Sequence, residues 1–141
     1  MNLSRIALSA VGAFVAYFVL GGLSFVLFPS LKNEFLKYPA VYRTPDAMKS
    51  VMPVGMAAML VAMIVLAVIY AMLYQGGSGV AAGARFGALI GVFAICAFVI
   101  HNYVNLNIGS KLTLQQSIAY FMEWMVAGMV IGLIYRPPVL R

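Results

Sequence analysis

The stretch that decides the fold is Gly79-Val-Ala-Ala-Gly83-Ala-Arg-Phe-Gly87-Ala-Leu-Ile-Gly91, which carries a glycine at every fourth position of a long apolar segment. On a helix, residues four apart lie one above another, so these glycines would form a smooth groove along one side. In a bilayer the helix keeps its own hydrogen bonds, and small residues allow a second helix to approach backbone to backbone. A second pair at the same spacing is Gly128 and Gly132. We therefore predict that the helix-packing residues are Gly79, Gly83, Gly87, Gly91, Gly128 and Gly132.

The composition is that of an integral membrane protein. Of the 141 residues, 65% are hydrophobic and 9% are charged, whereas a soluble domain carries about 25% charged residues. This length predicts one membrane domain, residues 1–141, with no separate soluble domain. The net charge of +6 comes from basic residues spread beside apolar segments, as expected of anchors at lipid headgroups. We therefore expect a lipid environment and no nucleic-acid partner.

Four apolar runs match the length of about 20 residues that spans a bilayer. They cover residues 6–28, 51–74, 79–104 and 114–135. The fold predicted is an all-α integral membrane protein, a four-transmembrane-helix antiparallel bundle. Residues 29–50 hold charges, aromatics and prolines and are expected to form an interfacial loop. Four spans place both termini on one side of the membrane, and arginines beside the spans favour the cytoplasm for that side.

Local signals indicate where helices begin and where the chain turns. Thr44-Pro45-Asp46 has a capping hydroxyl, a proline suited to the first helical position and an acid near the positive helix end. If a helix begins there, Pro53 lies inside it and should kink it. Thr113 and Gln116 have the spacing of a capping box at the start of the fourth span. Residues 75–78 predict a tight turn, and Arg136-Pro137-Pro138 should end the last helix.

Three ionisable residues lie at membrane depth in this scheme: Glu123, Arg85 and His101. Such residues suggest a function, because burying one at the centre of a span costs on the order of 3 kcal/mol. At about 100° per residue, Arg85 points away from the glycine groove, and Glu123 lies across its helix from Gly128 and Gly132. We therefore do not expect Arg85 and Glu123 to pair.

Each of these residues has a functional and a structural interpretation. Glu123 either handles a proton or cation, or is a protonated or hydrogen-bonded residue that ties helices together. Arg85 has a side chain long enough to reach the interface from its position in the span. His101 and Asn105 lie on the glycine face and are expected to be buried there. His101 is the only histidine, which favours a hydrogen-bonding role over a metal or haem ligand.

The residues that recur in the second half of the chain carry a family resemblance. They are Gly83-x-Arg85-Phe86-Gly87-x3-Gly91, Glu123-Trp124 and Gly128-x3-Gly132-Leu-Ile-Tyr-Arg-Pro137. The arrangement resembles a family of small, uncharacterised four-span bacterial membrane proteins. The resemblance implies a multi-pass protein of the bacterial inner membrane and brings no known activity with it.

The sequence contains no recognisable catalytic arrangement, phosphate loop or cysteine pair. We therefore expect no enzyme activity, cofactor or metal site. The predicted function is association, as an accessory or structural subunit of a larger membrane complex or as a homo-oligomer formed through small-residue helix faces. The alternative is a small proton- or cation-coupled transporter or channel that uses Glu123.

Overall fold

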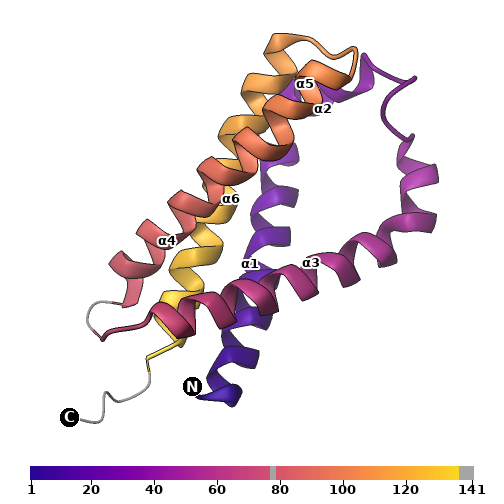
Figure 1. Ribbon diagram of the computed structural model, residues 1–141. Coiled ribbons are helices and arrows are strands. Elements are labelled where there is room, and N and C mark those ends of the chain that lie inside the picture. Colours follow the sequence, from indigo (N-terminus) through magenta and orange to yellow (C-terminus); the bar gives the residue numbers. More distant parts are fainter. Residues whose placement is uncertain (77–78, 137–141) are drawn as a thin grey trace.

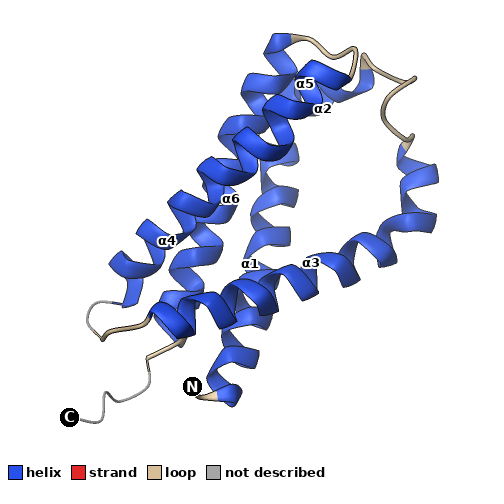
Figure 2. Ribbon diagram, in the orientation of Figure 1, coloured by secondary structure: helices blue, strands red, loops and turns tan. Residues whose placement is uncertain are grey.

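The computed structural model describes residues 1–76 and 79–136, and within these ranges the chain folds into helices without strands (Figures 1 and 2). The helices are α1 (Leu3–Leu27), α2 (Pro29–Leu36), α3 (Pro45–Leu73), α4 (Gly79–Ala94), the π-helical segment η1 (Ile95–Ile100), α5 (His101–Asn105) and α6 (Ser110–Ile134). Because α4, η1 and α5 follow one another without a break, four helical segments are long and apolar enough to cross a membrane. The chain is a multi-pass, all-α membrane protein.

The spans end within one residue of the predicted positions, and three of the four begin earlier than predicted, whereas the third begins at Gly79 as predicted. Each predicted end lies one residue from an observed one, at Leu27, Leu73, Asn105 or Ile134. Three predicted starts lie inside helices that begin at Leu3, Pro45 and Ser110. The difference arises because an apolar run marks only the part of a helix that lies in the hydrocarbon region of the membrane. The helix itself also includes a polar first turn.

The helix start predicted at Thr44-Pro45-Asp46 is confirmed. Thr44 caps α3, and its Oγ1 accepts a hydrogen bond from the Ala47 backbone N–H at 3.3 Å. Pro53 lies inside this helix, and Figure 1 shows α3 changing direction in its N-terminal part, as expected of a proline that removes an intrahelical hydrogen bond. The turn that follows α3 includes Gly76, whose φ of 92° suits glycine. Gly77 and Ser78 of that predicted turn, and Pro137 and Pro138 of the predicted helix stop, lie outside the described residues.

The prediction of a loop over residues 29–50 is wrong in its first part, which forms α2. Pro29 occupies the first turn of α2, where its missing N–H costs nothing and its fixed φ suits a helix. The loop proper is therefore confined to the residues between α2 and α3.

The capping box predicted at the start of α6 is also wrong. The helix begins a turn earlier, at Ser110, after Gly109. Thr113 is already inside it and donates its hydroxyl to the Gly109 carbonyl at 3.2 Å, while Gln116 donates to the Tyr42 hydroxyl at 3.3 Å. The Gly109 N–H donates to the Tyr38 hydroxyl at 2.9 Å. The start of α6 is therefore supported by a contact with the distant residue Tyr38 and not by the predicted capping box.

The segment η1 alters the third span in a way that the sequence pattern does not indicate. A π-helix carries an extra residue per turn, so it rotates everything after it about the helix axis. Buried positions recur every four residues up to Gly91, whereas Ala94 and Val99 are buried five apart. As a result His101 and Asn105 are exposed, and the expectation that both are buried on the glycine face is wrong.

The packing of the bundle is uneven. The most extensive helix–helix contact joins α4 to α6, and α1 packs against α6 on one side and α3 on the other. Small residues, among them Ala10, Ala13, Ala67 and Ala127, allow α1, α3 and α6 to approach closely in the main core. The buried residues of α3 all lie in its C-terminal half, and every residue from 43 to 58 is exposed. Figure 1 shows this N-terminal part of α3 leading away from the other helices.

Candidate functional site: the Glu123 cavity

The six glycines predicted for helix packing lie in one seam between α4 and α6, which we call the glycine seam. Gly79, Gly83, Gly87 and Gly91 are buried on α4, and Gly128 and Gly132 are buried on α6. A Cβ atom on Gly83 would overlap the Gly128 carbonyl oxygen, and one on Gly132 would overlap the Gly79 carbonyl oxygen. The seam is thus closed backbone against backbone, and it leaves no room for a ligand.

The structure separates the three ionisable residues of the spans. Arg85 and His101 are exposed, whereas Glu123 is buried, with 8% of its surface accessible. Arg85 forms no ion pair within the described part of the chain. Glu123 is therefore the ionisable residue of the spans that the fold encloses.

Glu123 lines a partly open cavity of about 380 Å³, whose wall is formed by residues of α1, α2 and α6 and by Met52 of α3. The carboxyl group lies over Gly21 of α1, where a Cβ atom would sit 3.3 Å from Oε1. The absence of a side chain at Gly21 therefore makes room for the carboxyl group. Tyr17, one helical turn before Gly21, faces the carboxyl group with its hydroxyl, and Tyr120 lines the cavity from α6.

The remainder of the cavity wall is mainly apolar and aromatic. Phe18 and Phe25 contribute from α1, Leu31 and Phe35 from α2, and Met52 from α3. The rings of Phe25 and Phe35 join α1 to α2, with centroids 5.7 Å apart. Among the described residues, no lysine, arginine or histidine lines the cavity. Ser24 and Gln116 also line the cavity, so its described wall combines one carboxyl group, two phenols, a hydroxyl and an amide with aromatic rings.

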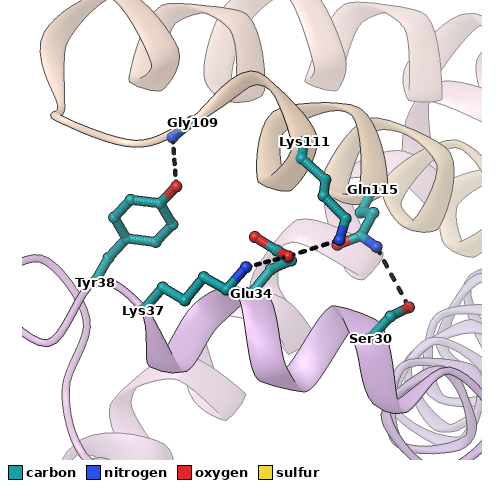
Figure 3. Close-up of polar contacts among 7 residues, drawn as sticks. All are labelled: Ser30, Glu34, Lys37, Tyr38, Gly109, Lys111 and Gln115. Atoms are coloured by element: carbon teal, nitrogen blue, oxygen red, sulfur yellow. Dashed lines mark hydrogen bonds and ion pairs between the residues drawn. The ribbon is translucent and has the colours of Figure 1, made fainter.

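A polar cluster outside the spans holds α2 in place at one end of this cavity (Figure 3). Glu34 Oε1 accepts from Lys37 Nζ at 2.7 Å and pairs with Lys111 Nζ at 2.8 Å, and the Glu34 side chain is 5% exposed. We call these three residues the Glu34 cluster. Hydrogen bonds from Lys111 and then Lys37 hold the pKa of the Glu34 carboxyl below its usual value. Because Leu31 and Phe35 are on the same short helix, the cluster also fixes two walls of the cavity.

Two further contacts attach the same region to α6. Besides the bond between Tyr38 and Gly109, Gln115 donates to the Ser30 hydroxyl at 3.3 Å (Figure 3). The covering of the cavity by α2 is therefore secured by polar contacts at the membrane boundary, where they are cheaper to form than inside the spans.

The opposite end of the bundle is closed by contacts between the two ends of the chain. Arg5 Nη1 donates to the Ile134 carbonyl at 3.3 Å, and the Asn2 N–H donates to the Tyr135 hydroxyl at 3.5 Å. Tyr70 and Tyr74 pack edge-on against Tyr135, with ring centroids 6.2 and 5.5 Å away. The start of α1 and the end of α6 consequently lie at the same end of the molecule.

The sequence pointed to Glu123 but not to the residues that surround it. Tyr17 carries a hydroxyl at the middle of the first span and lies four residues before Gly21, which is the one local signal available for this wall. Tyr120 lines the cavity from α6 three residues before Glu123, and the sequence pattern does not single it out. Glu34 and Lys37 are at helical spacing, but Lys111 is distant in the sequence. No cluster of His, Cys, Asp and Glu suited to a metal ion occurs among the described residues.

No protein-family model, curated protein or solved structure matches the chain. The resemblance noted in its second half therefore stays a prediction.

Proposed function

We propose that the protein is a non-catalytic membrane component that works by associating with a transmembrane helix of another chain, in a larger complex or in a homo-oligomer. The single observation that carries this proposal is the exposure of every residue from 43 to 58, over the N-terminal half of α3. Helices in a bilayer associate through close packing, and a helix that leaves its neighbours gives up that packing.

The facing part of α1 supports the same proposal. Residues 25–28 are exposed, and Gly22 of α1 and Gly55 of α3 have open space where a Cβ atom would lie. Small, unoccupied positions of this kind allow another helix to approach closely. The glycine seam is filled within the chain, so association has to use this other surface. We place the protein in the bacterial inner membrane with both termini in the cytoplasm.

The experiment is native mass spectrometry of the protein after mild extraction from the membranes of the organism that makes it. We expect the wild-type chain to emerge with fixed stoichiometry, bound to other subunits or to itself. Gly55→Trp should dissociate that assembly, whereas Leu89→Trp, at an exposed position of α4, should leave it intact. Emergence of the wild-type chain as a monomer would overturn the proposal.

A second function, proton- or cation-coupled transport by Glu123, is favoured by the exposure of its carboxyl group to a cavity rather than to a packed interface. The two functions differ in what Glu123→Gln does. Transport predicts that proton or cation flux in liposomes is lost while the assembly remains intact. An accessory role without transport predicts instead that Glu123→Gln mainly weakens the assembly.

A further inference from the structure

We propose that the Glu123 cavity binds a hydrophobic organic cation, with its charge at the carboxylate and its apolar body against the aromatic wall. This inference goes beyond the association proposed above, because the cavity is built within one chain and needs neither a partner nor transport.

The first argument is charge. Glu123 is the one acidic residue of the cavity wall, and the described part of the wall has no basic residue to neutralise it. Lys37 and Lys111 are paired with Glu34, and Arg85 is exposed on α4. A buried carboxylate is costly unless it is paired. The hydroxyl of Tyr17 faces the carboxyl group but carries no charge. A ligand that brings a positive charge would supply the missing counter-charge, whereas an anion would be repelled.

The second argument is the shape of the wall. The carboxyl group and the phenols of Tyr17 and Tyr120 form one part of the cavity, while Phe25 and Phe35 form the part next to α2. Aromatic faces attract desolvated cations and also accommodate apolar groups. A volume of about 380 Å³ lies in the range of small-molecule sites. The cavity therefore suits a molecule with a charged centre and a bulky apolar body.

The third argument is access. Met52 is the one described residue through which α3 contributes to the cavity, and it belongs to the exposed part of that helix. Within the described part of a single chain, no packed helix therefore covers the cavity on the α3 side. A hydrophobic cation, which partitions into the membrane, can reach the carboxyl group from the hydrocarbon region.

The test uses the purified full-length chain in phosphatidylcholine nanodiscs and a pair of probes that match in shape and differ in charge, tetraphenylphosphonium and tetraphenylborate. Binding is measured by equilibrium dialysis and by fluorescence of Trp124, the only tryptophan, whose ring lies 5.2 Å from that of Tyr17. We expect saturable binding of the phosphonium at one site per chain and no saturable binding of the borate.

Substitutions assign the site. Glu123→Gln keeps the size of the side chain and should weaken phosphonium binding by about tenfold or more, because it removes one partner of a buried charge pair. Asp46→Asn, which removes an acid at an exposed position, should bind like the wild type. Ala119→Leu should block binding by filling the cavity without changing any charge.

Each variant is first checked for wild-type helicity and for thermal unfolding in the same nanodiscs. If Glu123→Gln unfolds, phosphonium binding by Ala119→Leu becomes the test of the site. Equal binding by the wild type and a folded Glu123→Gln would overturn the proposal, and so would undiminished binding by a folded Ala119→Leu. Saturable binding of both probes with equal affinity would overturn it as well, because recognition would then not depend on charge.

Discussion

The two faces of α6 meet their neighbours in opposite ways. On one face, Gly128 and Gly132 lie against the glycines of α4 with the backbones in contact. On the other, Glu123 lies over Gly21 of α1 and lines a cavity of about 380 Å³. Both contacts join long apolar helices, so hydrophobicity does not distinguish them. What differs is the size of the side chains that face each other.

This difference shows what close packing in a membrane requires. The α4 face of α6 closes because small residues recur in register on both helices. On the α1 face, Gly21 is small, but it is flanked at helical spacing by Tyr17 and Phe25. A single glycine in a row of large residues leaves room for a carboxyl group, but it does not allow the backbones of two helices to come into contact. Space for a ligand is therefore left where the small residues do not match.

The largest effect on stability is expected from a substitution in the glycine seam between α4 and α6. Gly83→Ala would place a Cβ atom into the Gly128 carbonyl oxygen, and backbone cannot move aside as a flexible side chain can. We expect destabilisation of about 1–3 kcal/mol or more, measured as a lower midpoint of thermal unfolding in detergent by circular dichroism. Gly55→Ala is the matched control, since its Cβ atom would meet nothing within 4 Å. Equal midpoints for the two variants would show that the seam is not closed.

A smaller effect is expected from removing one of the polar contacts near the α2 end of the Glu123 cavity. Tyr38→Phe removes the acceptor of the Gly109 N–H, and losing such a bond costs about 1 kcal/mol. The amides of the first turn of α6 should exchange with solvent faster than in the wild type, as measured by hydrogen exchange with mass spectrometry. Tyr103→Phe, at an exposed tyrosine, should leave exchange in that turn unchanged. Unchanged exchange in Tyr38→Phe would mean that the Tyr38 hydroxyl does not support the start of α6.

The Glu34 cluster makes the stability of the α2 end of the cavity dependent on pH. Because the pKa of the folded Glu34 carboxyl lies below its usual value of 4.5, the unfolded state binds more protons as the pH falls. The stabilisation is thus present above pH 4.5 and is lost as the pH falls through the depressed pKa. Glu34→Gln should lower the unfolding midpoint at pH 7 and reduce its dependence on acid.

The matched control for the Glu34 cluster is Asp46→Asn, which breaks an exposed pair with Lys49. Exposed pairs contribute little to stability, so the unfolding curve of this variant should follow that of the wild type at each pH. If Glu34→Gln behaved in the same way, the cluster would not contribute to the closure of the cavity.

The smallest effect on stability is expected from an alanine at Gly21, on the face of α1 that meets Glu123. A Cβ atom on Gly21 would lie 3.3 Å from Glu123 Oε1, and the carboxyl group can shift into the cavity. We expect destabilisation of about 1 kcal/mol or less, together with weaker binding of tetraphenylphosphonium in the dialysis experiment. Gly21→Ala and Gly83→Ala therefore make the same chemical change on the two faces. A loss of stability as large as that of Gly83→Ala would remove the distinction between them.

The sequence by itself determined the features that depend on neighbouring residues. The four spans follow from apolar runs, and the start of α3 follows from the proline and capping hydroxyl at Thr44 and Pro45. The positions of the glycines on one face of α4 follow from their spacing of four. Each is set by a period or a short motif that the chain carries locally.

Only the tertiary structure decided the features that join distant residues. Lys111 reaches Glu34, and Tyr38 reaches Gly109, across more than 70 residues. The π-helical turn of η1 moved His101 off the buried face, which a uniform helical period does not anticipate. The cavity itself exists because α1, α2 and α6 meet around Glu123. The physical reason is that a local pattern states which face of a helix is small or polar, whereas the space left between helices depends on which faces meet.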